Sequence, residues 1–137
     1  MDTKRVATAL GMAAAAAIAT VVVDVAPASA GAYGCAGVAV DSDTITRGGR
    51  TLGWLTFYWD SASGDNCAVM VKNGDVLPGR VPMQVAIHQA EAPYRTVQDP
   101  GNYTWYAGPV KVDGRNKCVW ANGHIDGVGG VIDDHCG

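Results

Sequence analysis

The chain has 137 residues, with 10 lysine and arginine residues against 13 aspartate and glutamate residues, and a formal net charge of −3. This mildly acidic balance, without a basic stripe, argues against nucleic acid as a partner, because phosphate binding depends on clustered Lys and Arg. The length indicates a single domain. The 4 cysteines in so short a chain indicate a protein stabilised by disulfides.

The first 30 residues have the three parts of a secretory signal peptide. Lys4 and Arg5 supply a positive start, residues 6–23 form an uncharged run rich in alanine and valine, and residues 28–30 (Ala-Ser-Ala) follow. Small residues at this position suit signal peptidase. A membrane span is the alternative, because the run is about long enough to cross a bilayer. The alanine-rich run and its cleavage-type end favour a signal peptide, so we expect residues 31–137 to be secreted as one domain without a membrane anchor.

The rest of the sequence shows the period of two that is typical of half-buried β-strands. Apolar residues at 81, 83, 85 and 87 alternate with Pro82, Gln84, Ala86 and His88. We predict strands at residues 38–45, 52–59, 67–72, 81–88, 103–112, 117–125 and 128–133. Turn-forming residues separate them, at 47–49, 63–66, 73–75, 78–79, 99–102 and 113–116. The predicted fold is all-β, a small antiparallel β-sandwich or barrel-like domain of about seven strands.

The four cysteines are Cys35, Cys67, Cys118 and Cys136. A zinc site is the competing interpretation, but the sequence has no C-x-x-C pair. Cys118 and Cys136 are symmetric about Gly127, so a hairpin turning there would place them opposite each other. If the first three strands form a meander, the first and third start at the same end, which places Cys35 near Cys67. We therefore predict the disulfides Cys35–Cys67 and Cys118–Cys136.

Catalytic groups are hard to find in this sequence. The exported part has three serines, Ser42, Ser61 and Ser63, and none lies in a G-x-S-x-G elbow. Asp41 and Asp43 share one face of a strand, but glycosidase carboxylates must flank a sugar in a cleft. Paired carboxylates beside a turn more often discourage edge pairing. We expect no catalytic activity, no catalytic residues and no cofactor.

A metal site near the C-terminus is a further alternative. The terminal hairpin could bring together five residues whose types suit a divalent cation: His124, Asp126, Asp133, Asp134 and His135. Solvated residues beside a terminal cysteine are the simpler interpretation, so no metal is assigned. His88 alternates with the apolar residues of its strand, so we expect it to be exposed.

The aromatic residues are the least ordinary feature. Trp54, Tyr58 and Trp59 lie on one predicted strand, and Trp105 and Tyr106 lie on another. Because side chains alternate along a strand, both faces must carry rings. One set is expected in the core, and the other would form an exposed aromatic binding surface for sugars or partner proteins. In the alternative, loops and the second sheet cover both sets.

Several blocks of sequence match a known pattern. Residues 99–125 (DPGNYTWYAGPVKVDGRNKCVWANGHI) contain Gly-Asn-Tyr, Tyr-Ala-Gly-Pro-Val and Lys-Cys-Val, and residues 65–69 (DNCAV) and Cys136 also fit. Over residues 67–136 the chain resembles the spore-associated protein A family of filamentous actinobacteria. The members of this family are small exported proteins with two disulfides. The resemblance implies a location on aerial hyphae or spores. It implies neither a catalytic activity nor particular site residues.

We expect an exported cell-surface or spore-associated protein that acts by binding or coating, with components of the cell wall or spore surface as partners. The alternative is a carbohydrate-binding module that recognises cell-wall or environmental polysaccharide through its exposed aromatic residues. An enzyme inhibitor acting through residues 88–94 is a weaker alternative, and a hydrolase is the weakest. The sequence specifies neither the ligand nor an oligomeric state.

Overall fold

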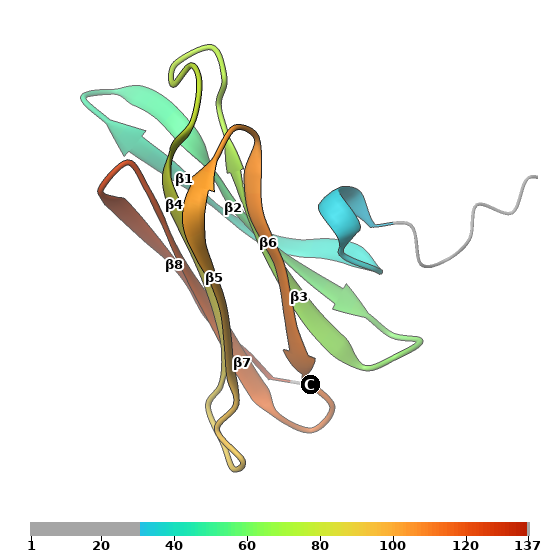
Figure 1. Cartoon of the computed structure of the whole chain (residues 1–137). Coiled ribbons are helices and arrows are strands. Elements are labelled where there is room, and N and C mark those ends of the chain that lie inside the picture. Colours follow the sequence, from blue (N-terminus) through green and yellow to red (C-terminus); the bar gives the residue numbers. More distant parts are fainter. Residues whose placement is uncertain (1–30, 137) are drawn as a thin grey trace, which may run out of the picture.

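The computed structural model describes residues 31–136, which form eight strands in two four-stranded antiparallel sheets (Figure 1). This confirms the predicted all-β fold. The predicted signal peptide, residues 1–30, lies outside the described residues. The strands follow a short 3-10 turn, η1 (Ala32–Gly34), and are β1 (Val38–Arg47), β2 (Arg50–Asp60), β3 (Asp65–Lys72), β4 (Val81–Gln89), β5 (Thr96–Tyr103), β6 (Tyr106–Asp113), β7 (Cys118–Ile125) and β8 (Val128–Cys136).

The first sheet has the order β1-β2-β3-β6, and the second has the order β5-β4-β7-β8. The first three strands form the predicted meander, and β7 and β8 form the predicted terminal hairpin. Two sheets packed face to face bury one face of each strand and leave the other outside. Each sheet therefore has an inner face, which faces the other sheet, and an outer face.

The prediction of a single strand at residues 103–112 is wrong. The structure ends β5 at Tyr103 and begins β6 at Tyr106, and the chain passes from the second sheet to the first between them. Residues 99–102, predicted as a turn, lie inside β5. Pro100 fits there because β5 is at the edge of its sheet, and an edge strand tolerates a residue without an N–H. This difference raises the number of strands from about seven to eight.

Asp99 stabilises the passage between the two sheets. Its carboxylate accepts a hydrogen bond from the hydroxyl of Tyr103 and another from the backbone N–H of Gly108, at 2.8 Å. The first of these bonds raises the pKa of Tyr103 above its ordinary value. Asp99, which the sequence predicted to lie in a turn, therefore joins β5 to β6 through its side chain.

The main hydrophobic core lies between the two inner faces. Leu55 and Phe57 of β2 belong to the same buried cluster as Val85 and Ile87 of β4, and all four side chains are fully buried. They occupy alternate positions, as the period of two requires. The residues between them therefore point to the outer faces, where a binding surface would lie.

A smaller cluster lies on the outer face of the first sheet. Tyr58 and Val69 are buried there together with Cys35 and Cys67. They are covered because the N-terminal segment with η1 lies against this sheet and is fastened to β3 through Cys35 (Figure 1). Burial accordingly raises the pKa of Tyr58.

Both predicted disulfides are confirmed. Cys35 and Cys67 are bonded across a sequence separation of 32 residues, and Cys118 and Cys136 across 18 residues. Cys118 and Cys136 are direct partners in the β7–β8 register. The first disulfide holds the N-terminal segment, and the second holds the end of the last strand.

Strands β1 and β8 lie at the edges of different sheets and are joined by polar contacts. Asp43 accepts a hydrogen bond from the backbone N–H of Val131 at 3.2 Å, and Arg47 forms an ion pair at 2.9 Å with Asp126 in the turn between β7 and β8. At Gly130 an added Cβ would lie 2.1 Å from Cδ1 of Ile45. A side chain at residue 130 would therefore require the side chains of Ile45 and Asp43 on β1 to move.

We predict that removing the Cys35–Cys67 disulfide destabilises the protein more than removing Cys118–Cys136. Loop-closure entropy gives losses in the free energy of unfolding of about 4 and about 3 kcal/mol for the two loops. Urea unfolding of the two double alanine variants, followed by far-ultraviolet circular dichroism, measures both losses. A larger loss for Cys118→Ala/Cys136→Ala would contradict the prediction.

Gly130→Ala should lower the free energy of unfolding by about 1–3 kcal/mol, because its methyl group would displace the buried Ile45 side chain and the Asp43 carboxylate that binds Val131. Gly74→Ala is the matched control, since its nearest neighbour would be the Trp105 ring at 3.9 Å. The control should change stability by no more than about 0.5 kcal/mol. Equal stabilities of the two variants in thermal unfolding would show that β1 and β8 do not need this close approach.

Candidate functional site

The five residues of the predicted aromatic surface do not lie together. Trp54 and Tyr106 lie on the outer face of the first sheet, in one row with Val71, because Val71 pairs with both. Trp54 is 37% exposed, whereas Tyr58 on the same face is buried beneath the N-terminal segment. Only part of the predicted surface therefore meets solvent on this face.

The other two tryptophans of the predicted surface, Trp59 and Trp105, lie elsewhere. Trp105 is in the turn between β5 and β6 and is 69% exposed. Trp59 alternates with Tyr58, so it points to the inner face, at one end of the sandwich. There it lines a cavity of about 310 Å³ together with four further residues: Val40, Asn66, His135 and Cys136.

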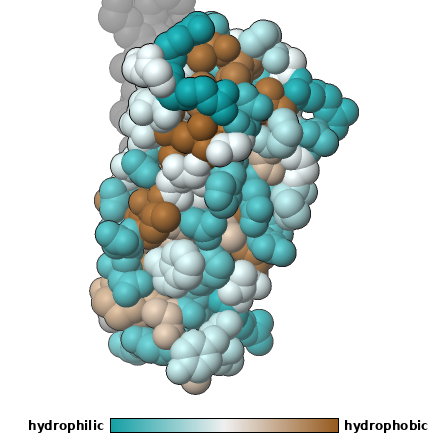
Figure 2. All heavy atoms as spheres, turned by 90° about the vertical axis from the view of Figure 1, so that its left-hand side faces the viewer, coloured by the Kyte–Doolittle hydropathy of each residue, from teal (hydrophilic) through white to brown (hydrophobic). Residues whose placement is uncertain are grey.

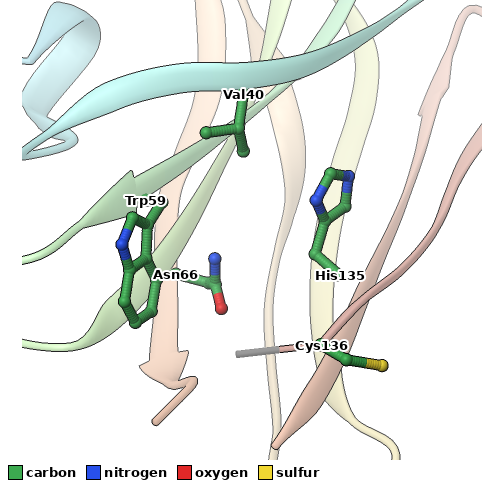
Figure 3. Close-up of a pocket in the computed structure, with 5 residues that line it drawn as sticks. All are labelled: Val40, Trp59, Asn66, His135 and Cys136. Atoms are coloured by element: carbon green, nitrogen blue, oxygen red, sulfur yellow. The ribbon is translucent and has the colours of Figure 1, made fainter.

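This cavity lies between the ends of the two sheets. Trp59 comes from β2 and His135 from β8, and their rings lie on opposite sides of the space (Figure 3). Val40 enters from β1 at a break in the β1–β2 register. Asn66 is buried and donates a hydrogen bond from Nδ2 to the carbonyl oxygen of Tyr58 at 3.2 Å. The cavity is thus built from both sheets.

His135 is held from two sides. Its Nε2 donates to Oδ2 of Asp41 at 3.0 Å, and its ring stacks on Phe57 with centroids 5.0 Å apart. The hydrogen bond from His135 holds the pKa of Asp41 below its ordinary value, and the backbone N–H of Ser42 lowers it further. The imidazole is therefore fixed between a carboxylate on β1 and the core.

The predicted carboxylate pair has structural partners on β8. Asp41 binds His135, and Asp43 binds the backbone of Val131. Glycosidase carboxylates must instead flank a sugar. In this structure the pair instead joins the edge strand β1 of the first sheet to the edge strand β8 of the second.

The structure does not bring the five residues of the metal alternative together. His135 pairs with Asp41, and Asp126 pairs with Arg47. Within residues 31–136, no group of three or more His, Cys, Asp or Glu side chains is placed to hold a metal ion. All four cysteines are in disulfides, which excludes the zinc interpretation.

A further pair of rings lies on the outer face of the second sheet, and neither ring belongs to the predicted aromatic surface. His88 and Trp120 stack with centroids 3.8 Å apart and an interplanar angle of 17°. His88 is half-buried, whereas the sequence predicted an exposed side chain. The signal was present in the sequence, because Trp120 alternates with the apolar residues Val119 and Ala121 and so belongs to an outer face.

Side chains on this outer face fix the His88 ring. Its Nε2 lies 2.7 Å from Oδ1 of Asn122 and its Nδ1 lies 2.9 Å from the hydroxyl of Thr96. A proton on Nε2 satisfies both contacts, because Nε2 then donates to the amide oxygen and Nδ1 accepts from the hydroxyl. The imidazole therefore covers one face of the Trp120 indole in a fixed position.

The other side of Trp120 faces a break in the β7–β8 register. Val119 pairs with His135 and Ala121 pairs with Ile132, so Asp133 and Asp134 together oppose the single residue Trp120. Such a bulge redirects side chains that would otherwise alternate. Trp120, Asp133 and Asp134 consequently line one shallow cavity of about 420 Å³.

Comparison with known proteins gives no assignment: no protein family, curated protein or solved structure matches the chain. Among residues 31–136, no helix has both the length and the apolar character needed to cross a membrane. On the side of the molecule that faces left in Figure 1, hydrophobic residues form several separate patches among hydrophilic ones (Figure 2). This side therefore offers no single broad apolar surface.

The Asp41–His135 contact predicts a measurable pH dependence. Because the pKa of Asp41 is lowered in the folded protein, the contact stabilises the fold above the ordinary value of 3.8, and this contribution is lost as the pH falls through the lowered pKa. His135→Ala should therefore raise the pKa of Asp41 toward 3.8. Carbon-13 NMR titration of the Asp41 carboxyl group measures it. His124→Ala, on the opposite sheet's outer face, should leave it unchanged, and an unchanged value in both variants would contradict the assignment.

Proposed function

We propose that this chain is an exported binding protein, without catalytic activity, that attaches to polysaccharide at a cell or spore surface. We place its binding surface on the outer face of the second sheet. The observation that carries the proposal is the continuous row of side chains across this face, which runs from Thr96 through His88 and Trp120 to Asp133 and Asp134.

The row combines the two kinds of group that sugars require. The free side of the Trp120 indole is an apolar surface for the C–H groups of a sugar ring, and the carboxylates of Asp133 and Asp134 are acceptors for its hydroxyl groups. Polar groups beside an aromatic surface orient a ligand while the ring supplies contact area. The stacking of His88 on the opposite side fixes the indole before a ligand arrives, which reduces the entropy cost of binding.

The face is long enough for more than one sugar unit. From Pro82 to His88 it extends over seven residues of β4, or about 20 Å at the rise of a strand. Gln84 and Gln98 lie along it, with their side-chain amides 3.4 Å apart. His124 and Pro100 line a further shallow cavity at the other end of the face. A linear chain of sugars could therefore contact the face beyond Trp120.

Location at a cell or spore surface rests on the resemblance of residues 67–136 to the spore-associated protein A family and on the signal-peptide pattern of residues 1–30. The two disulfides support it, because disulfides form and persist in oxidising compartments outside the cytosol. A coating protein must adhere to the cell or spore surface, and it needs no catalytic groups to do so. Binding to surface polysaccharide would provide this adhesion.

We predict that Trp120→Ala lowers retention on the bound polysaccharide by about tenfold or more, equivalent to roughly 1.4 kcal/mol. The variant loses the ring surface that contacts sugar. Pull-down of the oxidised protein on intact spores, peptidoglycan, chitin and cellulose measures it. Asp133→Asn/Asp134→Asn tests the same cavity without altering the His88–Trp120 stack.

Trp54→Ala is the matched control, because it removes a partly exposed tryptophan from the other sheet. It should bind as the unchanged protein does. Loss of retention in Trp54→Ala alone would move the binding surface to the row of Trp54 and Tyr106. Absence of retention on all four materials would overturn polysaccharide binding.

A further inference from the structure

A polar cleft lies on the side of the sandwich opposite the β1–β8 contact. It has a volume of about 470 Å³ and lies where the edge strand β6 of the first sheet meets β5 of the second. Its lining includes Arg95, Val97, Lys111, Val112 and Lys117. The cleft therefore has residues of both sheets in its walls.

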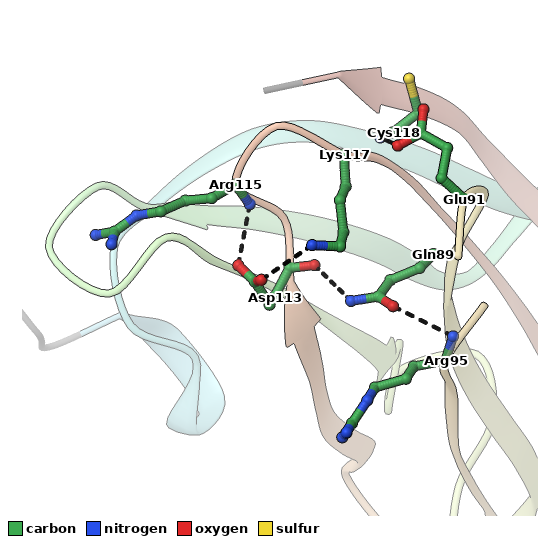
Figure 4. A network of polar contacts seen from close by, with 7 residues as sticks. All are labelled: Gln89, Glu91, Arg95, Asp113, Arg115, Lys117 and Cys118. Atoms are coloured by element: carbon green, nitrogen blue, oxygen red, sulfur yellow. Dashed lines mark hydrogen bonds and ion pairs between the residues drawn. The ribbon is translucent and has the colours of Figure 1, made fainter. Parts of the chain in front are cut away.

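The base of the cleft is held by a buried amide. Gln89 is 5% exposed, and its Nε2 donates to the carbonyl oxygen of Asp113 at 2.9 Å while its Oε1 accepts from the backbone N–H of Arg95 at 3.3 Å (Figure 4). Both polar ends of the side chain are satisfied within the protein. Gln89 thus joins the start of β5 to the end of β6 and fixes the distance between the two walls.

The charges in the cleft are unevenly paired. Both oxygens of Asp113 are occupied, because Oδ1 accepts from the backbone N–H of Arg115 at 3.1 Å and Oδ2 accepts from Nζ of Lys117 at 3.3 Å. These two bonds hold the pKa of Asp113 below its ordinary value. Within the part of the chain that the structure describes, neither Arg95 nor Lys111 forms an ion pair.

The lining residues carry an excess of one positive charge. Three cations, Arg95, Lys111 and Lys117, face two carboxylates, Asp65 and Asp113. The chain as a whole has a net charge of −3. A local excess of positive charge in an acidic protein, at two cations that form no ion pair within residues 31–136, favours an anionic ligand.

We propose that this cleft binds an acidic sugar unit, whose carboxylate or phosphate is held between Arg95 and Lys111. A guanidinium group offers paired donors that match either anion, and an ammonium group adds a second charge from the opposite wall. The volume is in the range of small-molecule sites and exceeds what a bare inorganic anion needs. Val97 and Val112 supply apolar contacts for ring carbons.

The anion site stands on its own geometry and relies on the proposed function only for the ligand being a sugar. It lies apart from the Trp120 surface, since the two share no lining residue. The Trp120 surface would then bind neutral sugar units of a surface polymer, and the cleft would bind an acidic unit of the same polymer. Two sites on one polymer raise the overall affinity when both can be engaged together.

Calorimetric titration of the purified, oxidised protein with trigalacturonate and with glucose 6-phosphate tests the proposal, and distinguishes a carboxylate from a phosphate. Arg95→Gln/Lys111→Gln should weaken binding of the acidic ligand at least tenfold. Arg50→Gln/Arg80→Gln makes the same change of charge at exposed residues outside the cleft and should alter binding by no more than twofold. Raising the salt concentration should weaken binding, because the attraction is between charges.

Three results would overturn the proposal: equal losses in the two double variants, no binding of either acidic ligand, or binding of inorganic phosphate as tight as that of the acidic sugars. Trp120→Ala separates the two hypotheses. If it loses polysaccharide retention but still binds the acidic ligand, both sites are supported. If the acidic ligand binds at Arg95 and Lys111 while no polysaccharide is retained by any variant, the cleft proposal stands and the proposed function fails.

Discussion

The attachment of β8 to β7 and to β1 is the constraint on which the rest of the structure depends. As an edge strand, β8 has a hydrogen-bonded neighbour strand on one side only, but it is also bonded to β7 by Cys118–Cys136 and to β1 by the contacts of Asp43 and Asp41. These contacts close one side of the sandwich. They also determine which way each residue of β8 points, so both the inner cavity at His135 and the outer cavity at Trp120 exist only while β8 keeps its register.

The bulge in β8 shows how one extra residue produces two surfaces. In a regular strand Asp133 and Asp134 would point to opposite faces. Because both oppose Trp120, they share the outer face, and His135 turns inward to stack on Phe57. The carboxylates are thereby placed beside an aromatic ring, where they can serve a ligand. A cluster of acidic residues that suggests metal binding in the sequence becomes, in three dimensions, one wall of a ring-lined cavity.

Much of the fold could be predicted from local sequence, since the period of two and the turn residues are properties of short segments. The pairing of Cys118 with Cys136 followed from hairpin symmetry about Gly127. The error at residues 103–112 arose because a strand and the turn that ends it can contain the same residue types. Pro100 is typical of a turn unless its strand is known to lie at the edge of a sheet. Which strands lie at an edge depends on the whole topology.

The candidate site was harder to predict because exposure is decided by what covers each face. Tyr58 and Trp54 occupy the same face of β2, yet Tyr58 is buried by the N-terminal segment that Cys35 fastens. No rule of alternation contains that information. The surroundings of Trp120 are set by His88 and the bulge, which are distant from it in sequence. Aromatic composition therefore indicates that a ring-bearing surface exists, whereas the long-range contacts decide which rings remain open to a ligand and which polar groups surround them.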